Sequence, residues 1–157
     1  MKNENKLKIC FAASSGGHLE EISQLAGVKK GRDCFLITEK SDFFENTFCE
    51  NVYFVDQINR KQKTFVFCFI KLFLKCRKII KNENADCVIT TGALMGFAAA
   101  LAGKSAGKKV VYVESFARVD TASLTGRLIH PMADLFIVQW KEGLEFFPKA
   151  VYGGTIF

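Results

Sequence analysis

Residues 7–18 read Leu-Lys-Ile-Cys-Phe-Ala-Ala-Ser-Ser-Gly-Gly-His, an apolar run that ends in small and polar residues. A second apolar-periodic segment follows, so the pattern predicts a strand, a tight turn and a helix. Two consecutive glycines let a backbone adopt unusual dihedral angles and bring its amides close to a ligand. The helix directs its positive dipole end at the same place. We therefore expect Ser14, Ser15, Gly16 and Gly17 to bind a phosphate or diphosphate.

His18 stands beside this turn and can exchange a proton near neutral pH. The alternative is that the glycines only make the turn tight and that the histidine is structural. The stretch lacks the three glycines of a dinucleotide-binding loop and the Gly-Lys-Ser/Thr of a P-loop. NAD and P-loop chemistry are therefore disfavoured.

Composition indicates one globular α/β domain over residues 1–157, with 49% hydrophobic and 24% charged residues. The net charge of +6 suits a phosphate-bearing substrate, nucleic acid or an anionic membrane, and does not choose among them. Six cysteines form no CxxC pair and there are two histidines, so we expect reduced thiols and no metal site. Neither a signal peptide nor a transmembrane segment is expected.

Short apolar runs alternate with helical patterns along the chain, which predicts a single Rossmann-like parallel sheet with helices on both faces. The predicted strands are residues 7–13, 33–38, 52–55, 87–90, 109–113 and 135–138. The predicted helices are residues 18–28, 63–81, 94–106, 123–130 and 142–147.

Polar turns follow three of these strands, and in such sheets ligands bind beyond the carboxyl ends of the strands. Besides the first turn, Thr91 and Gly92 follow one strand, and Glu114, Ser115 and Arg118 follow another. We expect the three turns to converge. Glu114 is then free to accept hydrogen bonds from a substrate, or else caps a helix or pairs with Arg118. Arg118 is a candidate phosphate ligand or a solvated surface charge.

The helix predicted over residues 63–81 has a broad apolar face for the core and lysines on the opposite side. Two apolar residues fall among those lysines, which is typical of a helix lying on anionic lipid. An ordinary amphipathic helix is the alternative. The residues expected to touch a membrane are Phe67, Lys71, Leu74, Lys75 and Lys78.

The chain ends in an apolar, glycine-containing tail with no charge after Lys149. Terminal segments are usually polar, so this tail is expected to dock. It either adds a strand to its own sheet or inserts into another chain. The residues concerned are Tyr152, Gly153, Gly154, Ile156 and Phe157.

Several stretches together resemble one family. They are Ser-Ser-Gly-Gly-His-Leu at 14–19, Thr-Glu-Lys at 38–40, Thr-Gly-Ala at 91–93, Val-Glu-Ser-Phe-Ala-Arg-Val at 113–119, Leu-Thr-Gly-Arg-Leu at 124–128, Asp-Leu-Phe-Ile-Val-Gln-Trp at 134–140 and the ending Pro-Lys-Ala-Val-Tyr-Gly-Gly-Thr-Ile-Phe. Together they resemble bacterial capsular and exopolysaccharide biosynthesis proteins of the PssD/CpsF type. That family is similar to the membrane-anchoring subunit of the eukaryotic two-chain UDP-GlcNAc transferase of N-glycan assembly.

The resemblance implies the N-terminal, acceptor-side half of a GT-B glycosyltransferase such as MurG. A second chain would carry the C-terminal half with most of the UDP-sugar site. The pair would transfer a sugar to a polyprenyl-diphosphate-linked acceptor at the cytoplasmic membrane face, without a metal or cofactor. The eukaryotic subunit begins with a membrane-spanning helix, and no such helix is expected in this sequence. The basic helix over residues 63–81 is therefore expected to provide a peripheral attachment instead.

By the same resemblance, His18 is the candidate base for the acceptor hydroxyl or an orienting donor to phosphate. Glu114 corresponds to an acceptor-side acid and Arg118 to a diphosphate contact, while the tail would dock on the partner chain. A non-catalytic anchor and activator of that partner is the alternative function. A self-contained nucleotide-binding protein is disfavoured because the chain provides one Rossmann unit, and nucleic-acid binding because no aromatic-basic recognition motif is present.

Overall fold

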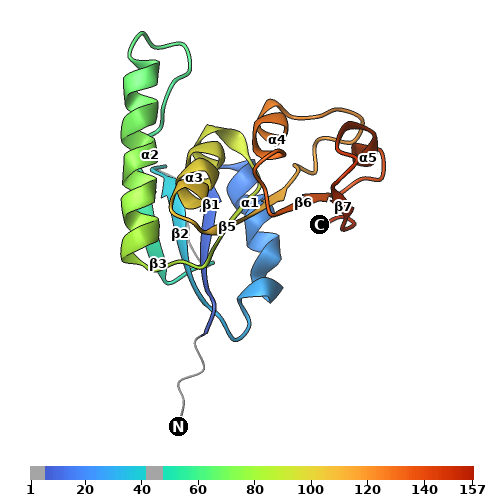
Figure 1. Ribbon diagram of the computed structural model, residues 1–157, viewed down its shortest axis with the longest axis horizontal. Helices are drawn as coiled ribbons and strands as arrows, with labels where there is room; N and C mark the ends of the chain where they lie inside the picture. The colour runs from blue at the N-terminus through green and yellow to red at the C-terminus, as the bar shows by residue number, and fades with distance from the viewer. Residues whose placement is uncertain (1–5, 42–47) are drawn as a thin grey trace.

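The computed structural model describes residues 6–41 and 48–157, and within them seven parallel strands form one sheet (Figure 1). Their order across the sheet is β3–β2–β1–β4–β5–β6–β7. The strands are β1 (Lys8–Ala13), β2 (Asp33–Glu39), β3 (Asn51–Val55), β4 (Cys87–Thr90), β5 (Lys109–Val113), β6 (Leu135–Val138) and β7 (Val151–Tyr152). The predicted Rossmann-like parallel sheet is confirmed.

The helices follow the predicted alternation, with one clear difference in the first. They are α1 (Gly17–Ser23), the 3₁₀ helix η1 (Gln24–Lys29), α2 (Phe65–Asn82), α3 (Ala93–Ser105), α4 (Leu124–Ile129) and α5 (Gly143–Phe146). The prediction of one continuous helix over residues 18–28 is wrong beyond Ser23. The Ser23 hydroxyl donates to the carbonyl of Glu20, a local bond that competes with the helical pattern. Gly27 lies in the same segment and is a poor helix former.

Both faces of the sheet carry an apolar core, as expected for strands covered by helices on both sides. Successive side chains of β1 point to opposite faces. Cys10 and Ala12 therefore pack in one core with buried residues of α2 and α3, whereas Ile9 and Phe11 pack in another with Ile22 of α1. These two cores hold the amino ends of α1 and α3 over the carboxyl ends of the central strands.

The order of the strands reverses at β1, which pairs with β2 on one side and β4 on the other. Connections leave this point toward opposite faces, so the carboxyl ends of β1 and β4 border a crevice. Since β5 pairs with β4, the turn after β5 opens at the same edge. All three predicted turns therefore lie together.

Helix α2 has one buried face and one exposed apolar face. Leu72, Cys76 and Ile80 are buried against the sheet. On the other side four large apolar side chains are 50–70% exposed: Val66, Phe67, Ile70 and Leu74. The exposed lysines 71, 75 and 78 lie among them. The prediction that Phe67 and Leu74 fall outside the core face is confirmed, and two neighbours extend the set. Within residues 6–41 and 48–157, no helix has the length and apolarity to cross a bilayer.

The apolar tail adds a strand to its own sheet. Val151 and Tyr152 form β7 and pair in parallel with Ile137 and Val138 of β6. The next amide, that of Gly153, donates to the carbonyl of Val138 at 3.0 Å. The sequence left two alternatives open for the tail, a strand in its own sheet or insertion into another chain. The structure shows the strand in its own sheet.

The turn before β6 is stabilised by Asp134, and this generates a prediction. The amide of Val110 and the ammonium groups of Lys104 and Lys109 donate to its carboxylate at 2.9–3.1 Å, and these bonds lower its pKa well below the usual value. Because the pKa falls on folding, the carboxylate contributes stability above about pH 4 and loses it as the pH falls further. Because the carboxylate and its lysine partners are exposed, we expect Asp134→Asn to lower the free energy of unfolding by about 0.5–1.5 kcal/mol at pH 7, measured by urea denaturation.

The difference between wild type and Asp134→Asn should stay nearly constant down to about pH 4 and shrink as the pH falls further. Asp120→Asn removes an exposed carboxylate and serves as the control, with a change within about 0.5 kcal/mol at every pH. An effect of Asp134→Asn that does not change with pH would contradict the assignment of its stability to the charged form.

Candidate functional site

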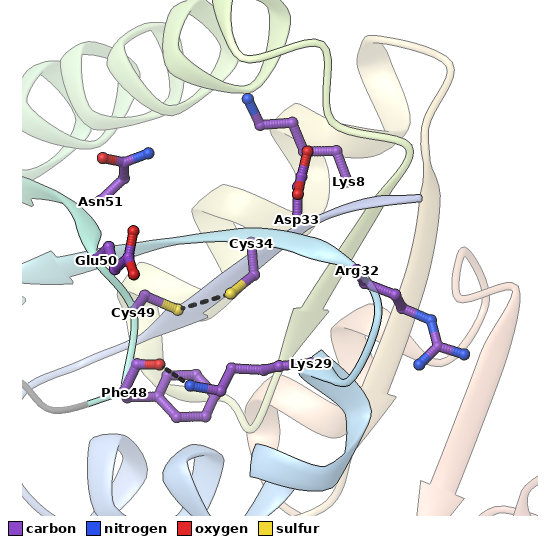
Figure 2. A pocket seen from close by; sticks show the side chains of 9 residues that line it. All are labelled: Lys8, Lys29, Arg32, Asp33, Cys34, Phe48, Cys49, Glu50 and Asn51. Carbon is purple, nitrogen blue, oxygen red and sulfur yellow. Dashed lines mark hydrogen bonds between the residues drawn. The ribbon is translucent and has the colours of Figure 1, made fainter. Parts of the chain in front are cut away.

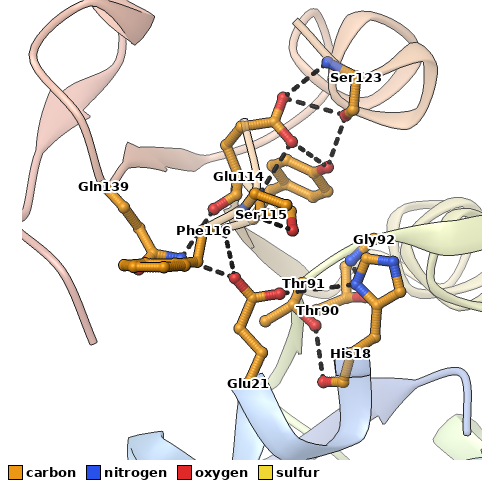
Figure 3. Close-up of polar contacts among 12 residues, drawn as sticks. His18, Glu21, Thr90, Thr91, Gly92, Glu114, Ser115, Phe116, Ser123 and Gln139 are labelled. Atoms are coloured by element: carbon orange, nitrogen blue, oxygen red, sulfur yellow. Dashed lines mark hydrogen bonds and ion pairs between the residues drawn. The ribbon is translucent and has the colours of Figure 1, made fainter. Parts of the chain in front are cut away.

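Two glycines shape the turns at the carboxyl ends of β1 and β4. Gly16 and Gly92 have φ angles of +85° and +116°, a region that side chains with a Cβ rarely adopt, and each precedes a helix. The amide of Gly92 donates to the Thr90 hydroxyl at 3.2 Å, and the Thr91 hydroxyl donates to the carbonyl of His18 at 3.1 Å (Figure 3). The second turn thus supports the backbone of the first, so the predicted convergence of these turns is correct.

The imidazole of His18 lies close to the bare backbone of Gly92. A Cβ on that glycine would stand 3.5 Å from His18 Cε1. His18 Nδ1 is buried, lies 3.7 Å from a carboxylate oxygen of Glu21, and forms no hydrogen bond within residues 6–41 and 48–157. The side chain is 31% exposed. The ring therefore has an acidic neighbour on one side and access to the surface on the other.

Glu21 is the central polar residue of the site, and sequence analysis did not identify it. Its side chain is only 4% exposed. The carboxylate accepts hydrogen bonds from the amide of Phe116 and from Gln139 Nε2, the latter at 2.8 Å. It joins α1 to the turn after β5 and to the end of β6 (Figure 3). The available signal was its position three residues after His18, on the same face of a helix.

Gln139 connects the same cluster to the C-terminal tail. Its Nε2 also donates to the carbonyl of Glu114 at 3.0 Å, and its Oε1 accepts from the amide of Ile156 at 3.0 Å. The neighbouring Trp140 donates its indole N–H to the carbonyl of Phe116 at 2.7 Å. One buried amide thus touches the Glu21 carboxylate, the turn after β5 and the tail.

Glu114 is buried and its carboxylate is occupied by protein donors. It accepts from the Tyr112 hydroxyl, the Ser115 amide and both the amide and hydroxyl of Ser123, all at 3.0–3.2 Å. Ser123 in turn caps α4 by accepting from the Gly126 amide at 2.8 Å. Burial and the adjacent Glu114 raise the pKa of Tyr112, which keeps its hydroxyl protonated. Glu114 therefore does not cap α4 itself but holds the cap residue Ser123 in place, and the substrate contact stays a prediction.

Arg118 does not pair with Glu114. Its guanidinium is exposed and reaches the Thr121 hydroxyl at 3.5 Å. Its amide donates to the carbonyl of Ser115, which fixes the turn from which the side chain leaves. The guanidinium is therefore available to an anionic ligand.

A pocket of about 520 Å³, here called the His18 pocket, brings these groups together. It is lined by His18, Arg60, Ala93, Tyr112, Glu114, Ser115, Ala117, Arg118, Ser123, Leu124 and Thr125. Its size falls within the roughly 300–1,000 Å³ of small-molecule sites. Arg60 lies in a polar stretch before α2 and carried no sequence signal. Two guanidinium groups and an imidazole make the pocket suitable for phosphate groups.

The other residues predicted to bind phosphate are not part of the lining of this pocket. They are Ser14, Ser15, Gly16, Gly17, Thr91 and Gly92. Ser14 and Ser15 hydrogen-bond with Glu39 at the end of β2; burial raises the pKa of that carboxyl and these bonds oppose the rise. Thr91 and Gly92 support His18, as described above. Phosphate binding by Ser14, Ser15, Gly16 and Gly17 therefore stays a prediction.

A second cavity, of about 580 Å³, lies at the amino ends of β1 and β2 (Figure 2). Cys34 and Cys49 face each other there with their sulfur atoms 3.4 Å apart, well beyond the length of a disulfide. Burial and the neighbouring thiol raise the pKa of Cys49 to about 12, so it is protonated at neutral pH. Because ligands bind at the opposite ends of parallel strands, we do not assign the functional site here.

Comparison with known proteins gives a family match. The family described as "Oligosaccharide biosynthesis protein Alg14 like" matches residues 51–156. The "UDP-N-acetylglucosamine transferase subunit ALG14" of Rattus norvegicus is 29% identical over 179 residues, which cover 96% of this chain and 83% of that protein. The protein of the same name from Kluyveromyces lactis is 52% identical over 48 residues, 31% of this chain and 20% of that protein.

Solved structures of low sequence identity share the fold. MurG of Acinetobacter baumannii superposes with a TM-score of 0.69 at 16% identity, over 85% of this chain and 41% of that one. A UDP-N-acetylglucosamine 2-epimerase from Rickettsia bellii gives 0.77 at 13% identity, over 96% and 45%. This chain therefore corresponds to less than half of each of these proteins, and the likeness concerns the fold alone.

The buried contacts of Glu21 generate a prediction. Removing the carboxylate leaves the Phe116 amide and Gln139 Nε2 without their acceptor, at a cost of about 1–3 kcal/mol for each buried donor. We expect Glu21→Ala to lower the free energy of unfolding by about 2–5 kcal/mol in urea denaturation. Glu21→Gln retains one acceptor oxygen and should recover most of that loss. The exposed neighbour Glu20 is the control, and equal losses in Glu20→Ala and Glu21→Ala would refute the role of Glu21.

Proposed function

Because this chain belongs to the Alg14-like family of oligosaccharide biosynthesis proteins, we propose that it is the anchoring and activating subunit of a two-chain, UDP-sugar-dependent glycosyltransferase. The observation that carries the proposal is the His18 pocket, which places two arginines and a histidine at the carboxyl ends of the strands. The donor we propose is UDP-N-acetylglucosamine, because the rat and human relatives are named as subunits of a transferase for that sugar.

The acceptor we propose is a saccharide linked to a polyprenyl diphosphate. Its diphosphate would lie between Arg60 and Arg118, whose guanidinium groups suit phosphate oxygens. A second chain would supply the donor-side half, since the GT-B arrangement implied by the MurG-like fold needs two facing halves. No metal or cofactor is part of the proposal, and assembly of capsule or exopolysaccharide stays a prediction from the bacterial resemblance.

We place the contact with the second chain at the tail. Tyr152 and Phe157 are 45% and 58% exposed, and β7 is the last strand of the sheet order within the described residues. An edge strand with exposed apolar side chains is a surface that another chain can extend or cover. Gly153, Gly154 and Ile156 lie in the same segment and complete the proposed contact.

We place membrane contact on the exposed face of α2, at the cytoplasmic side of the plasma membrane. Phe67 and Leu74 are exposed together with their apolar neighbours, and the exposed Lys71, Lys75 and Lys78 lie beside them on the same helix. Apolar side chains would enter the interface while the lysines meet anionic headgroups. The attachment would be peripheral.

The two-chain proposal predicts the outcome of a transfer assay. Labelled UDP-N-acetylglucosamine and a lipid-diphosphate acceptor are supplied to this chain, to a candidate donor-side chain, and to both. We expect transfer only when both are present. Full-rate transfer by the donor-side chain alone, in the presence of the same membranes, would refute an activating role.

A second candidate function, in which His18 acts on the acceptor hydroxyl, is favoured by its place in the pocket beside Arg118. The same assay separates the two roles. An anchoring subunit with His18→Ala should keep transfer within about tenfold of wild type, whereas loss of a general base costs about 10²–10⁴-fold. Co-purification of the two chains must persist in this variant, so that loss of assembly is not mistaken for loss of chemistry.

The α2 surface predicts a charge-dependent association with lipid. Lysines near an anionic membrane contribute about 1 kcal/mol each, so Lys71→Glu with Lys75→Glu should weaken binding to phosphatidylglycerol-containing vesicles at least about 20-fold in a sedimentation assay. Lys30→Glu is the control, because that exposed lysine follows η1, which packs on the opposite face of the sheet. A similar loss with Lys30→Glu would mean that only net charge matters.

A further inference from the structure

An apolar groove of about 260 Å³ opens between the first turns of α2 and α3 and the length of α4. It is here called the lipid groove. Its apolar lining is Phe65, Phe69, Leu94, Phe97, Leu124 and Leu128. Its volume is just under the roughly 300 Å³ at which small-molecule sites begin. From the sequence, Phe65 and Phe69 were expected in the core face of their helix, and the other four residues were assigned no role.

The walls of the lipid groove are built from half-buried rings. The ring of Phe69 stacks with those of Phe65 and Phe97 at centroid distances of 6.2 and 5.8 Å. On the α4 side Leu124 and Leu128 are 62% and 47% exposed. Large apolar side chains gathered around a hollow, rather than scattered singly, mark a surface that binds something apolar.

The groove is continuous with the His18 pocket. Arg60, Leu124 and Thr125 line both cavities. A ligand in the pocket therefore has an apolar path leading away from it, with a guanidinium at the junction. This arrangement suits a molecule whose hydrocarbon chain is joined directly to an anionic group.

A hydrocarbon chain suits the groove better than an extended peptide segment. The lining offers polar side-chain groups only at Arg60 and Thr125, whereas each peptide unit brings an N–H and a C=O that need partners when buried. The groove also begins at Phe65, in the same helical turn as the exposed Val66 and Phe67. A chain leaving the groove past α2 therefore reaches the face assigned to the membrane.

We propose that the lipid groove binds the isoprene units next to the diphosphate of the acceptor, with Arg60 holding the diphosphate at the junction. This inference rests on the proposed function, because it takes the acceptor to be a polyprenyl diphosphate. It adds roles for Leu124 and Leu128, and it places Arg60 where the diphosphate meets the hydrocarbon chain. The protein would then recognise the isoprene units nearest the diphosphate, where the apolar chain joins the charged group.

The test is a calorimetric titration of the full chain with three probes, which are inorganic diphosphate, geranyl diphosphate and farnesyl diphosphate. We expect farnesyl diphosphate to bind at least tenfold more tightly than inorganic diphosphate, with geranyl diphosphate between them. Equal affinities for all three would overturn the proposal.

Two variants locate the effect. Leu128 lines the groove but not the His18 pocket, so Leu128→Ser should remove most of the gain in affinity with chain length and leave the binding of inorganic diphosphate unchanged. Leu124→Ser is a second variant in the same wall, and both leucines are exposed enough for the chain to keep its fold. Arg60→Gln should weaken all three probes several-fold. Leu7→Ser is the matched control, because Leu7 is 51% exposed just before the amino end of β1, away from the groove.

If Leu7→Ser lowers the chain-length gain as much as Leu128→Ser does, the probes adsorb to apolar surface in general and the groove assignment fails. An additional titration with a short-chain, monomeric phosphatidylglycerol distinguishes a membrane phospholipid, and competition by this lipid at the groove would also overturn the proposal. The two proposals can fail separately. If binding depends on chain length but the two-chain assay shows no sugar transfer, the proposed function is wrong and the groove assignment stands. If transfer to a farnesyl-linked acceptor is unaffected by Leu124→Ser, the groove assignment is wrong and the proposed function stands.

Discussion

The buried carboxylate of Glu21 is the interaction on which the geometry of the site depends. It accepts from the Phe116 amide and from Gln139, and it lies 3.7 Å from His18 Nδ1. A buried carboxyl group is tolerated only where hydrogen-bond partners surround it, so α1, the turn after β5 and the end of β6 must stay together. Gln139 also accepts a hydrogen bond from the amide of Ile156. If another chain displaced the tail, Gln139 would lose this bond, and its contact with the Glu21 carboxylate would change as well.

The carboxylates of Glu21 and Glu114 bind groups of the protein itself, whereas the cationic side chains of the site line the pocket. Glu114 is surrounded by donors of its own turn and of the first turn of α4. Arg60 and Arg118 are exposed and line the pocket. From this polar end the surface becomes apolar along the lipid groove and then along α2. The charged pocket, the apolar groove and the membrane-facing side of α2 thus follow one another in the same order as the anionic group and the hydrocarbon chain of a lipid-linked anion.

Much of the fold followed from local pattern. The strands β4, β5 and β6 have the bounds predicted for them, because each is a short apolar run between polar or glycine-containing turns. The helix after the first turn was predicted too long, since propensity did not reveal the bond from Ser23 to Glu20. β7 was left open between two outcomes, because an edge strand of two residues forms only where a neighbour such as β6 offers its backbone.

The sequence by itself determined the parallel sheet, the placement of three turns at one edge, and His18 and Arg118 as residues of one pocket. These features depend on contacts between near neighbours and on the alternation of strand and helix. Only the tertiary structure decided that Glu21 supports the site, that Glu114 holds the cap residue of α4 and that Arg60 joins the pocket to the groove. Glu21 meets Phe116 and Gln139 across 95 and 118 residues, and a pairing over such separations depends on how the helices pack on the sheet.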